Sequence, residues 1–261
     1  MSSLDHSTLI KTALEAVLAG AKLAETAAAN AQTVQQKESL RDIVTQTDLR
    51  ISMLLVQSLG ATGLPVISEE AEATASAGAE AFWVVDPIDG TVNFTHGLAP
   101  YAVCAGLVEQ GECQLGVVCA PKLDELYFTL NTEKALLNGR PFVHPHRAPF
   151  EALVAASFSA KAGAAQYELF QAVNDSTRGC LRTGSAALNV CWAAAGKLQA
   201  AYGFAAKLWD VAAALAVARA AGCALRLHRH ADGLTVDYIV GSCEVVEHLA
   251  QLAHDKQLWT N

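Results

Sequence analysis

The sequence contains no long uncharged hydrophobic run, no C-x-x-C pair and no cluster of basic residues. Without an apolar run of about 18 residues, no transmembrane helix is expected. Residues 1–6 lack a basic region followed by an apolar core, which predicts a protein without a signal peptide. The seven cysteines are odd in number and scattered, so reduced thiols in a cytoplasmic protein are the simplest interpretation.

The chain has 261 residues, enough for one large domain or two modest ones. Hydrophobic residues make up 52% of it, so it can bury a substantial core. The formal net charge of −8, without a basic patch, weighs against nonspecific binding of nucleic acid. It does not weigh against phosphate esters as substrates, because bound cations reverse the local field.

The most informative stretch covers residues 82–94 and reads F-W-V-V-D-P-I-D-G-T-V-N-F. Its first four residues predict a short buried strand that ends at Asp86, because Pro87 cannot donate to a strand ladder. Asp86 and Asp89 follow in a tight bend, where two carboxylates repel each other unless a proton or a cation lies between them. Hard cations such as Mg2+ prefer oxygen ligands of this kind. An ordinary Asp/Pro/Gly turn is the structural alternative.

Four further positions combine a structural explanation with a possible site role. Asp48 would cap a helix that ends near residue 60, and Glu69 would lie in a solvated acidic turn. Asp210 lies in the first turn of a helix, where the helix dipole favours an acid. Ser185 would cap the helix that it precedes, and the free amides there favour an anion or a hydroxyl.

Hydrophobic periodicity predicts helices and strands in both halves of the chain. The expected helices are 4–31, 51–60, 164–173, 186–196, 209–221 and 244–255. The expected strands are 64–68, 82–85, 103–108, 114–119, 126–130, 153–158, 198–204 and 238–241. This mixture predicts an α+β or layered α/β fold, with the halves 1–145 and 146–261 separated by a proline-containing segment.

Two pairs of histidines stand outside these motifs. His144 and His146 lie in the proline-containing segment, and His228 and His230 flank an arginine. Zinc binding is conceivable at either pair, but no cysteine or further histidine supports it, so solvated positions are favoured.

The stretch D-P-x-D-G-T-x-N-F resembles the first motif of the inositol monophosphatase family, which are Mg2+-dependent, lithium-sensitive sugar phosphatases. Residues 209–213, with Gly222 behind them, resemble the second family motif, W-D-x-A-A followed by Gly. The resemblance extends over residues 37–241. It implies the sugar-phosphatase fold of alternating helix and sheet layers (αβαβα), in which both halves form one unit around one active site. It also implies a homodimer.

The resemblance further implies roles for individual residues. The implied metal ligands are Glu69, Asp86, Ile88 through its carbonyl, Asp89 and Asp210. The implied catalytic residues are Glu69, Thr91 and Asp48. The implied phosphate and substrate contacts are Gly90, Thr91, Gly184, Ser185 and Ala186, and two lysines, Lys37 and Lys207, are further candidates.

The implied reaction is hydrolysis of a small phosphorylated polyol, sugar or nucleotide by a metal-activated water. Two or three Mg2+ ions would serve it, with Mn2+ as a substitute and Li+ and Ca2+ as inhibitors. The partner would be a small-molecule phosphate ester, with no nucleic acid and no membrane. Inositol monophosphatases proper carry an acid seven positions before the Asp of the second motif, where this chain has Gly203. Inositol specificity is therefore not implied.

Relatives in the family act on fructose 1,6-bisphosphate, 3'-phosphoadenosine 5'-phosphate or histidinol phosphate, and Lys207 could suit a second phosphate. A catalytically silent regulatory or binding homologue is the non-enzyme alternative. A Ca2+-stabilised structural protein is less favoured, because the acids come from four separate segments rather than from one calcium loop.

Overall fold

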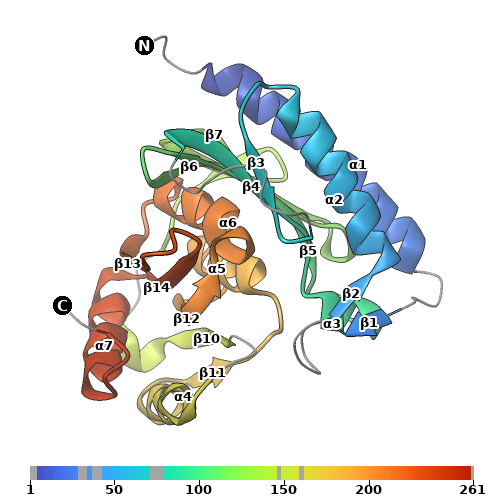
Figure 1. Ribbon diagram of the computed structural model, residues 1–261. Coiled ribbons are helices and arrows are strands. Elements are labelled where there is room, and N and C mark those ends of the chain that lie inside the picture. The colour runs from blue at the N-terminus through green and yellow to red at the C-terminus, as the bar shows by residue number, and fades with distance from the viewer. Residues whose placement is uncertain are drawn as a thin grey trace.

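The computed structural model describes residues 5–28, 34–36, 43–70, 79–145, 148–158 and 162–259, and the structural statements concern these residues. They form five layers, helices and sheets in alternation (Figure 1). Helices α1 (His6–Ala28) and α2 (Gln46–Gly60) cover the outer face of a seven-stranded sheet. Helices α5 (Ala186–Ala194) and α6 (Leu208–Ala220) lie between this sheet and a five-stranded one. Helices α4 (Ala164–Ser176) and α7 (Cys243–Asp255) cover the far face. The layered αβαβα prediction is confirmed.

The seven-stranded sheet is built by consecutive strands in the order β3 to β9. Strand β3 is parallel to β4, and all other neighbours are antiparallel. Its strands are β3 (Val66–Ser68), β4 (Ala81–Asp89), β5 (Ala102–Glu109), β6 (Glu112–Ala120), β7 (Glu125–Asn131), β8 (Lys134–Leu137) and β9 (Arg140–Phe142). A separate antiparallel pair joins β1 (Val34–Gln36) and β2 (Ile43–Thr45).

The five-stranded sheet has the order β11-β10-β12-β14-β13. Strand β10 is parallel to β11 and β12, and the β12–β14 and β13–β14 pairs are antiparallel. Its strands are β10 (Leu153–Phe158), β11 (Gly179–Leu181), β12 (Ala200–Lys207), β13 (Ala224–Arg229) and β14 (Thr235–Gly241). The short helix α3 (Thr91–Thr95) and the 3-10 turns η1 (Pro121–Leu123) and η2 (Pro149–Glu151) complete the described elements.

Strand β4 continues past the point where the sequence predicts its end. Asp86 pairs with Cys104 and Asp89 pairs with Ala102, so β4 carries one residue more than β5 between these pairs. Such a bulge leaves the extra residue outside the ladder, which is why Pro87 is tolerated there. The prediction that the strand stops at Asp86 is therefore wrong, and the bulge sets the spacing of the two aspartates.

Helix α6 packs unusually close to the seven-stranded sheet, at two glycines. A Cβ atom built on Gly116 would lie 2.0 Å from the Ala213 carbonyl oxygen, and one on Gly106 would lie 2.7 Å from the Ala213 nitrogen. Since these glycines let the helix backbone touch the sheet, α6 brings its first turn, with Asp210, to the ends of β3 and β4. Most of α6 is buried Ala, Val and Leu, as expected for a helix covered by a sheet on both sides.

Two predictions about local structure need correction. Thr45, not Asp48, is the N-cap of α2; Asp48 is the third helical residue, and its side chain accepts from the Thr45 amide in a capping box. His144 is not solvated: it is buried, and its ring nitrogens lie 2.9 Å from the Ala193 carbonyl oxygen and 2.8 Å from the Ser242 hydroxyl. His146 lies outside the described residues.

All seven cysteines are free thiols, six buried and Cys243 exposed. None of the helices in the described parts of the chain combines the length and the apolar character that a membrane-spanning segment requires.

Candidate active site

Three predicted acids from distant parts of the chain converge where β3, β4 and α6 meet. Glu69 follows β3, Asp86 lies in β4, and Asp210 lies in the first turn of α6. One carboxylate oxygen from each lies within 4.8 Å of the other two. Burial raises the pKa of Asp86 well above its ordinary value, and the neighbouring charges, Glu69 first, raise it further. Burial and then the charge of Glu69 raise the pKa of Asp210 in the same way. The cluster therefore needs protons or a cation.

Asp89 lies beside this cluster, at the N-terminus of α5. Its carboxylate accepts hydrogen bonds from the Ser185 hydroxyl, from the Ala186 amide at 3.1 Å and from the Ala187 amide at 2.9 Å. Burial raises the pKa of Asp89 to about 6, although these donors act in the opposite direction. The sequence predicts an anion or hydroxyl site at this helix N-terminus, and in the structure the Asp89 carboxylate lies there. Ser185 caps the helix, as expected.

Asp48, Thr91 and Ile88 form a second polar group next to the acids. The Thr91 hydroxyl lies 3.2 Å from Asp48 Oδ1 and 2.9 Å from the Ile88 carbonyl oxygen. Asp48 is buried, and its burial raises the pKa of its carboxyl group, while the Thr45 hydroxyl bonded to it lowers that pKa. A hydroxyl between a carboxylate and a carbonyl is well placed to orient a water molecule.

The predicted substrate segment at residues 184–186 lies directly against the loop that carries Gly90. Gly90 and Gly184 both have positive φ, at 94° and 91°. A Cβ on Gly90 would lie 2.9 Å from the Pro100 carbonyl oxygen and 3.2 Å from that of Gly184, so only glycine fits without displacement. Asn93 joins the two loops, because its amide donates to the carbonyl oxygens of Pro100, at 2.6 Å, and Thr183, at 2.8 Å.

Asn93 is a positioning residue for which the sequence analysis predicts no role, although it stands in the first motif. Its position within that motif is the sequence feature that could have indicated the positioning role.

Of the two candidate lysines, only Lys207 lies in the described residues; Lys37 falls outside them. The Lys207 side chain is exposed, approaches the Thr235 hydroxyl at 3.3 Å and lies 5.8 Å from the centre of the Trp209 ring. Its positive charge lowers the pKa of Asp210, against the larger effects of burial and neighbouring acids. Lys207 thus flanks the acids at their solvent side.

The space around Gly203, where inositol monophosphatases proper carry an acid, is filled by Tyr238. A Cβ on Gly203 would lie 2.7 Å from Tyr238 Cε1, and the ring is fully buried. The Tyr238 hydroxyl donates to Ser157 Oγ at 2.9 Å, which also accepts from the Asn189 amide at 3.1 Å. No local sequence pattern predicts this arrangement, since it depends on the pairing of β12 with β14.

The donor set fits a hard divalent cation. The converging side chains offer carboxylate oxygens without a sulfur or imidazole ligand among Glu69, Asp86 and Asp210. Oxygen ligands of this type suit Mg2+, and the repulsion that raises the pKa values of Asp86 and Asp210 is one that a bound cation would relieve.

Comparisons with known proteins agree with this geometry. The family model described as the inositol monophosphatase family matches residues 5–258. A Thermotoga maritima protein named fructose-1,6-bisphosphatase/inositol-1-monophosphatase is 31% identical over 189 residues, which are 72% of this chain and 73% of that protein. The Nus factor SuhB of Pasteurella multocida is 32% identical over 161 residues, 60% of each chain. The crystal structure of the extragenic suppressor protein SuhB from Bartonella henselae superposes with a TM-score of 0.84 at 24% identity, covering 94% of this chain and 98% of that one.

Proposed function

The chain belongs to the inositol monophosphatase family, and from this premise we propose that it hydrolyses phosphomonoesters of small polyols, sugars or nucleotides with bound Mg2+. The observation that carries the proposal is the convergence of Glu69, Asp86 and Asp210 within 4.8 Å, with Asp89 beside them. Like charges gathered around a buried carboxylate, that of Asp86, oppose folding, so their convergence favours a role that needs cations.

Different residues of the chain would bind the metal ions and orient the attacking water. Glu69, Asp86, Asp89, Asp210 and the Ile88 carbonyl would hold two or three Mg2+ ions. When bound, Mg2+ supplies a Lewis acid for the phosphoryl oxygens and lowers the pKa of a coordinated water. Thr91 and Glu69 would orient the attacking water, because the Thr91 hydroxyl donates toward Asp48 and keeps a lone pair to accept from that water.

The loops around Gly90 and Gly184 would position the substrate. The backbone amides of Gly90 and Thr91 would bind phosphoryl oxygens, and the close contact of the two loops would fix where the ester oxygen lies. Ser185 would act in two ways: it donates to Asp89, and its oxygen can accept from a substrate hydroxyl. Ala186 contributes through its amide, which holds Asp89 in place.

For the substrate, the site favours phosphate esters that do not depend on the inositol-binding acid. Tyr238 occupies the space above Gly203, so no carboxylate can reach the substrate from this position. Lys207 at the exposed side of Asp210 supports the inclusion of bisphosphates, as does the name of the Thermotoga maritima relative. We also expect a homodimer, with a small-molecule phosphate ester as its substrate.

A panel of phosphate monoesters tests the proposal. The panel contains inositol phosphates, fructose 1,6-bisphosphate, 3'-phosphoadenosine 5'-phosphate and histidinol phosphate, each assayed for phosphate release with Mg2+ and with a chelator. We expect release from at least one ester with Mg2+ only, and loss by at least about 100-fold in Asp86→Asn. Mn2+ should substitute for Mg2+, and Li+ and Ca2+ should inhibit.

A regulatory protein that has kept the fold is the second candidate, because the Pasteurella multocida relative carries the name Nus factor SuhB. If Mg2+ binds to the wild-type chain and no ester in the panel is hydrolysed, the phosphatase proposal is overturned in favour of this candidate.

A further inference from the structure

Two histidines and an aspartate meet at the edge of the five-stranded sheet, away from the acidic cluster. His228 lies in the edge strand β13, His230 follows that strand, and Asp237 lies in β14 directly opposite His228. Residues two apart on a strand share a face, so the pairing brings all three side chains together. One ligand atom from each lies within 4.8 Å of the other two. Sequence reasoning found the histidines but not the third ligand, since Asp237 joins them only through strand pairing.

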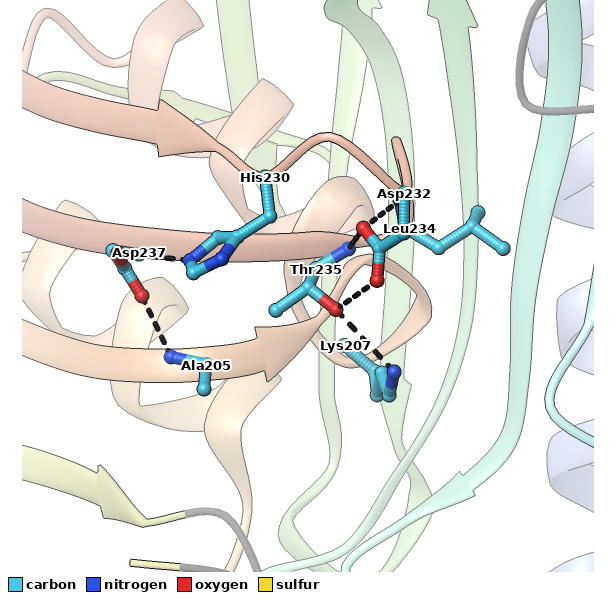
Figure 2. Close-up of polar contacts among 7 residues, drawn as sticks. All are labelled: Ala205, Lys207, His230, Asp232, Leu234, Thr235 and Asp237. Atoms are coloured by element: carbon cyan, nitrogen blue, oxygen red, sulfur yellow. Dashed lines mark hydrogen bonds and ion pairs between the residues drawn. The ribbon is translucent and has the colours of Figure 1, made fainter.

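Asp237 has a polar contact at each of its carboxylate oxygens. Figure 2 shows its carboxylate between the His230 ring and the backbone of Ala205. The Ala205 amide donates to Asp237 Oδ1 at 2.7 Å, and His230 Nε2 lies 3.0 Å from Oδ2. Asp237 is buried, with 8% of the residue exposed. The Ala205 amide bonds to one carboxylate oxygen, and the other oxygen is directed at the imidazole. Carboxylates that bind metals are commonly oriented by a hydrogen bond of this kind.

The Ala205 amide reaches Asp237 because the backbone takes an uncommon conformation. Ala205 has φ of 51°, in the left-handed region, at the register shift between Gly203 and Ala206 in β12. A residue other than glycine rarely adopts this conformation without a stabilising contact. The bulge therefore serves to aim an N–H group at Asp237.

We propose that His228, His230 and Asp237 form a second metal site, which binds one transition-metal dication of the Zn2+ type. Imidazole nitrogens with one carboxylate favour Zn2+, Co2+, Ni2+ or Cu2+ over Mg2+, whereas the acidic cluster offers oxygen alone. The 3.0 Å separation of His230 Nε2 and Asp237 Oδ2 suits two ligands bound to one ion at about 2.0–2.1 Å. His228 is exposed at the edge strand, so its ring can turn toward the same ion.

The position of this site gives the ion a structural effect. The turn after His230 is organised by Asp232, which accepts from the Leu234 amide at 2.9 Å and the Thr235 amide at 2.8 Å (Figure 2). The Leu208 amide at the start of α6 donates to the Leu234 carbonyl oxygen at 2.8 Å. An ion joining β13 to β14 would therefore stabilise the turn that adjoins the first turn of α6, without touching the reacting atoms.

Metal binding to the full-length chain tests this inference without using hydrolysis as the readout. The protein is freed of metal with a chelator and dialysed into millimolar Mg2+, so that Mg2+ can fill the acidic cluster. Zn2+ binding is then measured by competition with a chromophoric chelator, and Co2+ binding by its visible absorption. We expect one Zn2+ per chain in the presence of excess Mg2+, and a Co2+ spectrum typical of nitrogen ligation.

Variants at the ligands separate this site from adventitious binding. His230→Ala and Asp237→Asn should each weaken Zn2+ binding by at least about 10-fold, and asparagine can still accept from the Ala205 amide, so the fold should persist. His254→Ala is the matched control, because His254 is an exposed histidine 3.9 Å from the Asp255 carboxylate, and it should leave the affinity unchanged.

Equal Zn2+ affinity in wild type, His230→Ala and Asp237→Asn would overturn the proposal, as would the absence of Zn2+ binding in excess Mg2+. Either result would leave His230 and Asp237 as an ordinary hydrogen-bonded pair. A failed phosphatase assay would leave this test unaffected, because it reads metal binding alone.

Discussion

Replacing Gly116 with alanine should destabilise the protein strongly. The added Cβ would lie 2.0 Å from the Ala213 carbonyl oxygen and 2.7 Å from the Ala213 carbonyl carbon. Both atoms belong to the backbone of α6, so no side chain can rotate away, and the helix or the strand must move. Overpacking of this kind costs about 1–3 kcal/mol and occasionally more, and the depth of this overlap places Gly116→Ala at about 3 kcal/mol or above.

Thermal and urea denaturation measure this effect. For a chain of this size, about 3 kcal/mol corresponds to a fall in Tm of roughly 6–12 °C. The displacement should also reach the site, because α6 carries Asp210. Mg2+ should therefore raise the Tm of Gly116→Ala less than it raises that of the wild type.

Gly60→Ala is the matched control, since it makes the same chemical change at the end of α2, where no atom beyond the adjacent residues and the helix's own backbone lies within 4 Å of the added Cβ. Alanine there should be neutral or stabilising by up to about 1 kcal/mol, because it restricts the unfolded chain. If Gly116→Ala unfolded within about 0.5 kcal/mol of the wild type, the close packing of α6 on the sheet would be refuted.

Three further predictions follow from the site. In a chelator, the pKa of Asp89 is about 6 in the folded protein against 3.8 in the unfolded chain, so the folded state binds more protons between these values. The free energy of unfolding should therefore fall as pH rises from about 4 to 6, by on the order of 3 kcal/mol for this group, and saturating Mg2+ should remove the effect; urea midpoints that rise with pH in the chelator would contradict this. Ser185→Ala removes a helix cap and a donor to Asp89, and should lower the free energy of unfolding by about 1 kcal/mol in urea titrations; an unchanged midpoint would argue against the cap. Gly203→Glu should lower that free energy by about 1–3 kcal/mol without adding activity on inositol phosphates, because its Cβ would meet the buried Tyr238 ring; a stable variant with such activity would show that the ring can move aside.

The acids of the candidate site were predicted through their match to the family motifs, because local patterns alone favoured a cap, a turn or a helix start for most of them. The apolar run before Asp86 marks a buried strand, and the alanine-rich pattern after Asp210 marks a helix. The end of β4 was nevertheless predicted too early, since Pro87 normally interrupts a ladder. The bulge that accommodates it depends on the partner strand β5, which lies outside the local sequence.

The His228, His230 and Asp237 cluster shows what local patterns cannot predict. Strand β13 was missed because A-L-R-L-H-R mixes apolar and charged residues, as edge strands commonly do. Without β13, its pairing with β14 is unknown, and Asp237 cannot be matched to His228. His144 was misjudged for the same reason, because its partners Ala193 and Ser242 are far away in the chain.

The acidic cluster connects the packing of the protein with its chemistry. Folding brings Glu69, Asp86 and Asp210 together even though burial and mutual repulsion raise the pKa values of Asp86 and Asp210. Bringing these acids together costs free energy. Apolar packing elsewhere, including the contact of α6 with Gly116, offsets that cost. A cation that binds the folded state alone lowers this cost, so bound Mg2+ should add to the stability of the protein, and more so the tighter it binds. Variants that loosen α6 should therefore lose affinity for Mg2+ even when every carboxylate is intact.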